Sequence, residues 1–409
     1  MFALILAGEA VFALPFHIAR FFRPTVLEVF QISATELGAA QGVYGIVAMI
    51  AYFPGGPLAD RFPARKLMAF SLWSTAAGGL YMATFPGYAG AALVWGFFGV
   101  TTILFFWAAL IRATRDWGGS NAQGRAFGIL DGGRGLMAAV LASVGAIVFT
   151  LAFPDGYSAA SSSDKADALS TVIYGYTVVT ALTGVFVWFA LTDQPTNPSG
   201  PTNLRWDSLR RNFSQVFRTR AIWWQALIVI CAYVGFKGLD NFTLFAVQGH
   251  GIDEVDAAQI AVYGSWMRPV AAILAGMLGD HFRVHRALTA SFTILLLSHL
   301  FFATGNMGLA TWIIVANFLV TCAAVFALRG LYFAVFEDAN IPHHVTGTAV
   351  GLVSVVGYTP EIYVALVAGM FIDANPGLAG HQHFFLFQAC FALLGIFASV
   401  AFARSTRAA

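Results

Sequence analysis

The sequence predicts an all-α membrane protein with twelve transmembrane helices, arranged as two pseudo-symmetric halves of six. The first reason is composition, because 58% of the 409 residues are hydrophobic and only 10% are charged, whereas a soluble domain carries about 25% charged residues. The second reason is a series of long apolar runs. The third is a short basic segment that returns half a chain later, which indicates two related halves in a membrane.

Each apolar run is long enough for a helix to cross a bilayer, which takes about 20 residues. The runs lie at residues 2–22, 38–58, 67–85, 89–113, 125–152, 171–191, 221–247, 257–279, 287–304, 309–335, 345–371 and 383–403. They lack the alternation of barrel strands and have about twice the length of one, so spanning strands are excluded. The first run is interrupted by Glu9 and has no basic region before it, which predicts a retained span and not a cleaved signal.

The repeated basic segment lies at residues 55–66 and again at residues 276–286. At an offset of 220 (276 − 56 = 220), Gly56, Leu58, Asp60, Phe62 and Lys66 match Gly276, Leu278, Asp280, Phe282 and Arg286. A second match, between residues 124–129 and 347–352, has nearly the same offset of 223 (347 − 124 = 223). The chain is therefore expected to divide into an N-terminal half at 1–192, a linker at 193–219 and a C-terminal half at 220–409.

Lys and Arg in the short loops indicate the orientation, because they collect on the cytoplasmic side. One side carries Arg61, Arg65, Lys66, Arg115, Arg125, Arg283, Arg286, Arg404 and Arg407, with further arginines at 205, 210, 211, 218 and 220. The opposite side is acidic and has little base beyond Arg23 and Lys165. We therefore predict an integral protein of a bacterial inner membrane, with both termini and the linker in the cytoplasm.

The linker starts rich in Pro, Asn and Ser and then becomes basic, with Trp206, Phe213 and Phe217 among the charges. This pattern fits either an amphipathic segment on the membrane surface or a tether that only supplies positive charge. The patch is too short to indicate nucleic-acid binding.

The three cysteines, Cys231, Cys322 and Cys390, lie inside apolar runs and are expected to be small core residues. The histidines are scattered and predict no metal site.

Ionisable side chains inside the spans are the main functional candidates, because each costs about 2.5–3.5 kcal/mol at mid-membrane on insertion scales. They are Glu9, Arg20, Arg112, Asp131, Arg134, Lys237, Asp240, Arg268, Arg329 and Glu361. Asp131 with Arg134, and Lys237 with Asp240, lie three residues apart on one helical face. These four residues are predicted either to form two local ion pairs or to serve function.

The other six candidates have an excess of positive charge, because Glu9 and Glu361 are outnumbered by four arginines. An offset of 217 relates Arg20 to Lys237 (237 − 20 = 217) and Arg112 to Arg329 (329 − 112 = 217), in spans one, seven, four and ten. Cations at matched places favour a cavity built for an anion. The alternative for Arg112 and Arg329 is that they lie near the cytoplasmic ends and snorkel to the surface.

Residues 55–66 resemble the cytoplasmic loop signature of the major facilitator superfamily, although Pro63-Ala64 stands where a single Gly is usual. Residues 337–342, 346–351 and 357–361 look like the branch of that family that moves organic anions, organophosphates, nitrate and sugar acids. The resemblance implies a central cavity lined by spans one, four, seven and ten, alternating access, and an anionic group bound by basic side chains of spans one and seven.

We therefore expect a secondary transporter, present as a monomer, that moves a small organic anion together with protons. No Walker loop, dinucleotide fingerprint or nucleophile elbow occurs in the sequence, so neither enzyme activity nor a cofactor is expected. The candidate substrate-binding residues are Arg20, Lys237, Arg329, Arg134, Arg112, Arg268 and Tyr358. The candidate proton-coupling residues are Glu361, Asp240, Asp131 and Glu9.

Glu361 is the first choice for coupling because it follows Pro360, where a kink in span eleven would open a polar niche. Arg268 and Arg329 are its expected partners, either in proton coupling or in a fixed ion pair. The candidate gating residues are Asp60, Arg61, Arg65, Asp280 and Arg286. Asp60 and Asp280 are predicted to meet the positive helix ends at the cytoplasmic starts of spans eleven and five.

Three other functions fit the same features. The first is anion exchange without protons, which an excess of buried cations also favours. The second is multidrug efflux, although apolar drugs need fewer cations in the cavity. The third, from a different class, is a membrane receptor or assembly factor that kept the fold and lost transport.

Overall fold

The computed structural model describes residues 1–119, 122–192, 216–281, 284–305, 308, 310–332 and 346–407. Within this part of the chain every regular element is a helix and no strand occurs. Ten helical segments are long and apolar enough to cross a membrane. Two further long helices, α5 (Ala64–Met82) and α13 (Glu254–His281), bring the spans to twelve (10 + 2 = 12), which confirms the predicted fold class.

Several spans consist of more than one helical segment. The N-terminal half comprises α1 (Phe2–Phe12), η1 (Ala13–His17), α2 (Ile18–Phe21), α3 (Arg23–Phe30), α4 (Ala34–Arg61), α5 (Ala64–Met82), α6 (Tyr88–Gly99), η2 (Val100–Trp107), α7 (Ala108–Gly118), α8 (Gln123–Leu151), η3 (Tyr157–Ala159) and α9 (Ser162–Ala190). The C-terminal half comprises α11 (Arg220–Gly238), η4 (Leu239–Asn241), α12 (Phe242–His250), α13 (Glu254–His281), α14 (Val284–Thr304), α15 (Thr311–Leu331), α17 (Thr346–Gly357), α18 (Pro360–Ala374) and α19 (Leu378–Arg407).

Helix starts differ from the predicted ones where capping extends a helix beyond its apolar run. The helix α9 begins at Ser162, nine residues before the predicted 171 (171 − 162 = 9). Ser161 and Asp164 form a capping box there, which satisfies the first amide groups of a polar turn. Apolar content marks the membrane part of such a helix and not its full length.

Spans one, seven and eleven are interrupted. Span one contains the π-helical turn η1, and span seven contains the 3-10 turn η4. Span eleven breaks between Gly357 and Pro360, as the proline predicts, because proline has no amide hydrogen to continue the helix. Two of the buried carboxylates lie at these breaks, Asp240 in η4 and Glu361 in the first turn of α18.

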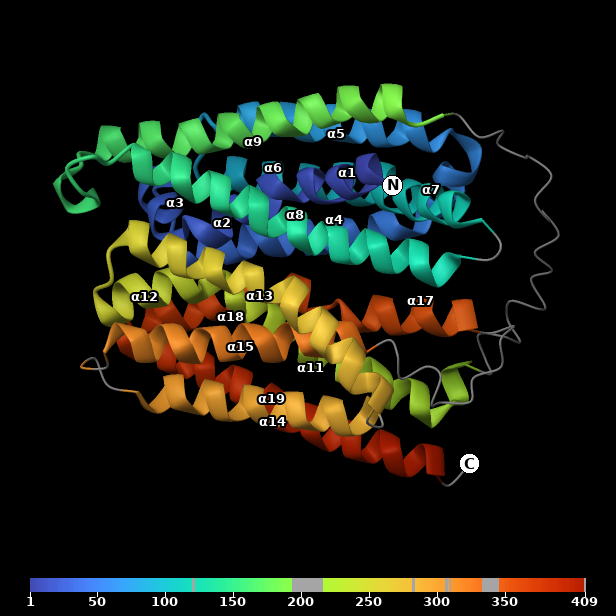
Figure 1. The fold of residues 1–409 in the computed structure, drawn as a ribbon. Helices are drawn as coiled ribbons and strands as arrows, with labels where there is room; N and C mark the ends of the chain where they lie inside the picture. Colours follow the sequence, from blue (N-terminus) through green and yellow to red (C-terminus); the bar gives the residue numbers. More distant parts are fainter. Residues whose placement is uncertain are drawn as a thin grey trace.

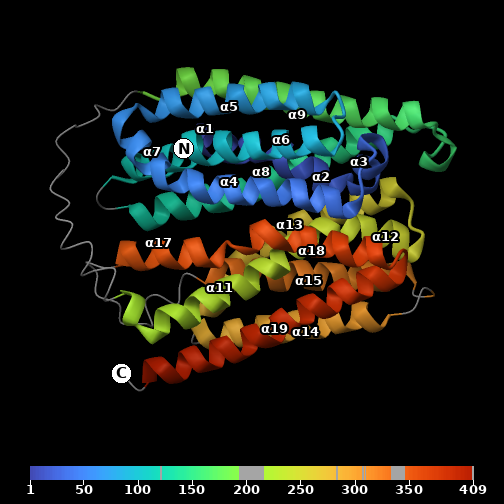
Figure 2. The same cartoon turned by 180° about the vertical axis from the view of Figure 1, so that it is seen from behind.

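The two halves lie side by side, with the N-terminal half above the C-terminal half in Figure 1 and the same division seen from behind in Figure 2. Both termini lie at one end of the molecule, together with the ends of α9 and α11 that flank residues 193–215. We call this the termini end and the opposite end the far end. The shared location of the termini is what an even number of spans requires.

The halves are joined mainly by two helix pairs, α4 with α18 and α8 with α13. Gly42 and Gly45 of α4 face the backbone of α18 without room for a side chain. A Cβ on Gly42 would lie 2.6 Å from the carbonyl oxygen of Ile362, and one on Gly45 would lie 2.9 Å from the carbonyl carbon of Glu361. Small residues allow two helices to approach this closely in lipid, so α4 and α18 form a tight seam.

The α8 helix shows where the contact between the halves ends. Gly135 of α8 lies against Arg268 of α13. Gly128 and Gly132 are on the same helical face, closer to the termini end, and a Cβ on either would meet nothing within 4 Å. Among the described residues, α8 therefore contacts the other half around Gly135, and no such contact is found at Gly128 or Gly132.

Candidate functional site

A chain of buried charged groups joins the two halves at the break of span seven. Nε of Arg20 donates to Oδ1 of Asp240 at 2.6 Å, and Nζ of Lys237 lies 2.6 Å from Oδ2. Lys237 also donates to Oε1 of Glu361 at 3.0 Å, and the hydroxyl of Tyr233 donates to Oε2 at 2.7 Å. Two cations and two carboxylates thus neutralise one another, which makes their burial in a membrane tolerable.

The sequence predicted one link of this chain and missed another. Lys237 ends α11 next to the turn η4, so it pairs with Asp240 three residues on, as predicted, and each is only 1% exposed. The bond from Arg20 to Asp240 joins residues 220 positions apart. The helix period brings together only residues that are three or four positions apart, so it could not show this contact.

The prediction for the partners of Glu361 was wrong. Its carboxylate lies against Lys237 and Tyr233, both on α11, and neither Arg268 nor Arg329 forms an ion pair with it in the described structure. The reason is the break at Pro360, which puts Glu361 into the first turn of α18. There α18 packs against both α11 and α4.

A second charged cluster surrounds Glu9 of α1. Oε2 of Glu9 lies 3.6 Å from Nη2 of Arg134 on α8 and 3.9 Å from Nη1 of Arg268 on α13. The other oxygen lies 3.7 Å from Nε2 of His17. Because Arg268 belongs to the C-terminal half, this cluster also crosses between the halves.

The predicted ion pair between Asp131 and Arg134 does not form. Arg134 turns toward Glu9 and donates from Nε to the carbonyl oxygen of Gly8 at 2.9 Å. Asp131 instead lies 3.5 Å from Nη2 of Arg268. Buried Glu9 attracts Arg134 more strongly than Asp131 does, because the side chain of Asp131 is 73% exposed and its charge is screened by solvent.

Arg329 of α15 makes no ion pair in the part of the chain that the structure describes. Its guanidinium lies 4.0 Å from the ring centre of Phe236 and 5.7 Å from that of Tyr233. Its Nη1 is buried and has no hydrogen-bond partner among the described residues. Contact with aromatic faces partly stabilises the cation but leaves its hydrogen-bonding edge for a ligand.

Tyrosines of spans seven, ten and eleven surround the same region. The ring of Tyr358, a predicted substrate residue, lies 5.0 Å from that of Tyr233. The hydroxyl groups of Tyr358 and Tyr332 are 3.4 Å apart. Arg329 is therefore next to polar hydroxyl groups as well as aromatic faces.

Arg112 lies away from these clusters. It donates from Nη1 to the carbonyl oxygen of Ala59 at 2.5 Å and its Nε lies 3.8 Å from Asp116. It thus caps the last turn of α4 at the termini end, which is the position that the snorkelling alternative describes. In the same region Arg65 donates to the carbonyl oxygen of Trp188 at 3.4 Å and stacks on its ring.

The other predicted gating residues have surface positions or lie outside the described side chains. Asp60, Arg61 and Arg286 are exposed. The side chain of Asp280 is outside the described part of the structure. Contact of Asp60 and Asp280 with the starts of spans eleven and five stays a prediction.

Of the cysteines, Cys231 and Cys322 are buried as predicted, whereas Cys390 is exposed, because α19 also has a surface-facing side.

Polar contacts between the halves at the far end were not predicted. The carboxylate of Asp373, at the end of α18, accepts hydrogen bonds from the amides of Ala34 at 3.2 Å and Thr35 at 2.7 Å. These amides begin α4, where a negative charge is favoured by the helix dipole. Thr25 of α3 donates to Glu254 of α13 at 2.6 Å. Such contacts close the far end.

Asp373→Asn is expected to weaken this closure. The neutral amide loses the charge at the start of α4, which is worth about 0.3–1 kcal/mol. The population with an open far end should rise about two- to fivefold, and the distance between spin labels across the far end will measure it. Glu36→Gln removes a carboxylate that caps α4 within the N-terminal half, and it should leave this distance unchanged.

Comparison with known proteins identifies the family. Residues 5–365 match the Major Facilitator Superfamily. Two inner membrane proteins of Escherichia coli K12 are similar over most of their length: YihN (29% identity, 97% of this chain and 93% of YihN) and YqcE (28% identity, 87% and 82%). Among solved structures, the fold is similar to a bacterial homologue of the human lysosomal transporter Spinster (TM-score 0.77, 13% identity, 98% and 96% covered) and to a D-xylose-proton symporter (0.76, 13%, 98% and 96%). The chain belongs to the Major Facilitator Superfamily and is an integral inner membrane protein with the fold of that family's transporters.

Proposed function

We propose that this protein is a secondary transporter that moves a small organic anion by alternating access, coupled to protons, with both termini and the linker in the cytoplasm. The observation that carries the proposal is Arg329, a partly buried cation whose Nη1 has neither an ion-pair nor a hydrogen-bond partner among the described residues. The four cations of the two charged clusters are matched by carboxylates. The fully buried Arg23 also has no ion pair among the described residues, but it faces neutral oxygens, those of the Gln41 side chain and the Asp240 carbonyl group. An anionic ligand would neutralise Arg329.

This assignment changes which residue is expected to be the main ligand of the anion. Arg20 and Lys237 were the first candidates for the anionic group, but both already bind carboxylates. Arg329 is therefore the primary anion ligand, and Tyr358 and Tyr332 lie where their hydroxyl groups can donate to the same ligand. Arg134 and Arg268 have a secondary role, since each is held by an acid of the Glu9 cluster.

The direction of access in this state follows from the contacts between the halves. The far end is closed by the α4–α18 seam, whereas toward the termini end a Cβ on Gly128 or Gly132 of α8 would meet none of the described residues within 4 Å. With cytoplasmic termini, this is an inward-facing state, and the anion exchanges with the cytoplasm. The resemblance of residues 357–361 to the branch that moves organic anions supports the same substrate class.

Thermal shift in detergent tests the assignment of Arg329, because a ligand that binds only the folded state raises the melting temperature. A panel of monocarboxylates, dicarboxylates, sulfonates and phosphate esters identifies the ligand with the wild-type protein. Arg329→Gln should weaken its binding about 10- to 150-fold, because hydrogen bonds to a charged group contribute about 1.5–3 kcal/mol.

Arg112→Gln is the matched control, since Arg112 lies at the termini end with its own partners. It should bind the ligand as the wild type does. Wild-type affinity in Arg329→Gln, with loss of binding in Arg20→Ala or Lys237→Ala, would instead place the anion at the charged chain of span seven. Multidrug efflux would show as a response to apolar cations and none to the anions.

A further inference from the structure

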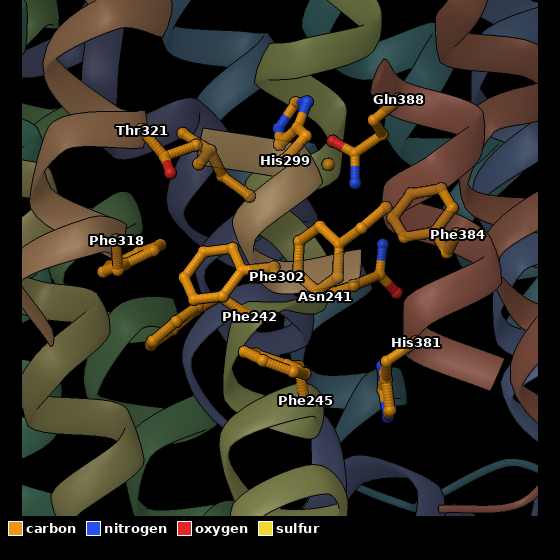
Figure 3. A pocket seen from close by; sticks show the side chains of 13 residues that line it. Asn241, Phe242, Phe245, His299, Phe302, Phe318, Thr321, His381, Phe384 and Gln388 are labelled. Carbon is orange, nitrogen blue, oxygen red and sulfur yellow. The ribbon is translucent and has the colours of Figure 1, made fainter. Parts of the chain in front are cut away.

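A small cavity lies inside the C-terminal half, between the break of span seven and helices α14, α15 and α19 (Figure 3). Most of its lining is apolar and includes the rings of Phe242, Phe245 and Phe302. Five polar side chains also line it: Asn241, Thr321, His299, His381 and Gln388. Polar side chains in an apolar membrane core require partners, so the hydrogen bonds of these five decide what the cavity holds.

Two of the five already have partners. Thr321 hydrogen-bonds with Ser298 and with the carbonyl oxygen of Asn317, and His381 bonds with Gln248. In each of the other three at least one polar atom has no partner among the described residues: both amide atoms of Asn241, Nδ1 of His299 and Nε2 of Gln388. These three side chains are 3%, 1% and 2% exposed. Bulk water therefore does not reach them.

The three unpartnered groups come from separate helices and face one space. Asn241 ends the turn η4, His299 lies on α14 and Gln388 on α19. Figure 3 shows the amide of Gln388 between the ring of His299 and the amide of Asn241. The side chain of Gln388 is also packed against Gly238, which fixes it beside the end of α11.

The lining selects a neutral, water-sized ligand that both donates and accepts hydrogen bonds. The cavity leaves about 20 Å³ for the centre of a water molecule, and about 10–15 Å³ is enough for one. None of the described lining residues is Asp, Glu, Lys or Arg, so nothing compensates the charge of an ion. The unpartnered atoms include an amide acceptor, Oδ1 of Asn241, and two amide donors.

We infer that Asn241, His299 and Gln388 hold a resident water molecule that links the break of span seven to spans nine and twelve. Three hydrogen bonds are the usual number for a buried water. Because Asn241 directly follows Asp240 in η4, the water fixes one side of the turn while Arg20 and Lys237 hold the other. The inference does not depend on which anion the protein moves.

X-ray footprinting of the wild-type protein tests the water directly, because radicals formed from a bound water oxidise the side chains around it. Phe302 and Phe292 are a matched pair on α14, since both are at most 1% exposed but only Phe302 lines the cavity. Phe302 should be oxidised and Phe292 should not. Equal oxidation rates of Phe302 and Phe292 in the wild-type protein would overturn the inference.

Apolar substitution of the three ligands is the second measurement. In Asn241→Leu/His299→Phe/Gln388→Leu, no polar group is left to hold the water, and the oxidation of Phe302 should fall to that of Phe292. The triple variant should also melt closer to the wild type than the sum of the three single shifts predicts, because the single variants leave partners unsatisfied. Persistent oxidation of Phe302 in the triple variant would show that these residues do not hold the water.

Discussion

Gly38→Leu is expected to abolish transport by preventing closure of the far end. Gly38 faces the carbonyl group of Ala365 across the seam between α4 and α18, and an added Cβ would overlap it. The clash is with backbone, which cannot rotate away as a side chain can. The added side chain would force α4 and α18 apart, so the variant should remain open at the far end and be unable to release its substrate at the termini end.

Spin labels across the far end will show this shift. Gln31 and Ala374 are exposed and lie in different halves near the seam, so cysteines there report its opening after Cys390→Ser removes the exposed native thiol. Gly38→Leu should lengthen this distance and eliminate counterflow. Gly175→Leu is the control, because a Cβ on Gly175 of α9 meets nothing within 4 Å. A short distance in Gly38→Leu would show that α4 and α18 do not form the far-end seal.

Most of the fold could be predicted from the sequence, because a bilayer restricts spanning segments to long apolar helices. The break in span eleven was visible as Pro360. The turn η4 had no such signal, since residues 239–241 contain neither proline nor glycine. The seam between α4 and α18 was not predicted either, because an abundance of Gly and Ala does not show which helix lies opposite.

The site was predicted as a set of residues but not as a set of contacts. Local spacing gave the pair of Lys237 and Asp240 and failed for Asp131 and Arg134, although both pairs have the same separation. The difference is Glu9, which comes from another helix and takes Arg134. Charge counting along the chain was informative, because Arg329, one of the cations that it indicated, has no ion pair among the described residues after the pairs are formed. It left out Arg23, which is fully buried and also has no ion pair there.

In the proposed transport cycle, proton coupling works through the chain of charges at span seven. In the present state Arg20 shares Asp240 with Lys237, so Lys237 is also able to bind the carboxylate of Glu361. When the far end opens, Arg20 moves away with the N-terminal half and Asp240 takes Lys237 for itself. Glu361 then loses its cation, and a buried carboxylate without one takes up a proton. Closing reverses the exchange and releases that proton toward the termini end.

Glu361→Gln is therefore expected to lose accumulation driven by a pH gradient while keeping counterflow. Glutamine fills the same space, and its carbonyl oxygen accepts from Lys237 while its amide group donates to the hydroxyl oxygen of Tyr233, but it cannot carry a proton. In vesicles with one pH unit across the membrane, a wild type that moves one proton per anion should concentrate the anion about tenfold beyond an uncoupled carrier. The variant should only equilibrate it.

Tyr233→Phe provides the control, because it removes the hydroxyl that donates to Glu361 and leaves the carboxylate and Lys237 in place. It should still concentrate the anion. Accumulation by Glu361→Gln at the wild-type level would move the coupling role to Asp240 or Glu9, the other buried carboxylates. A wild type that exchanges anions but ignores the pH gradient would identify an anion exchanger, in which Lys237 and Glu361 form a fixed pair and Arg329 alone binds the substrate charge.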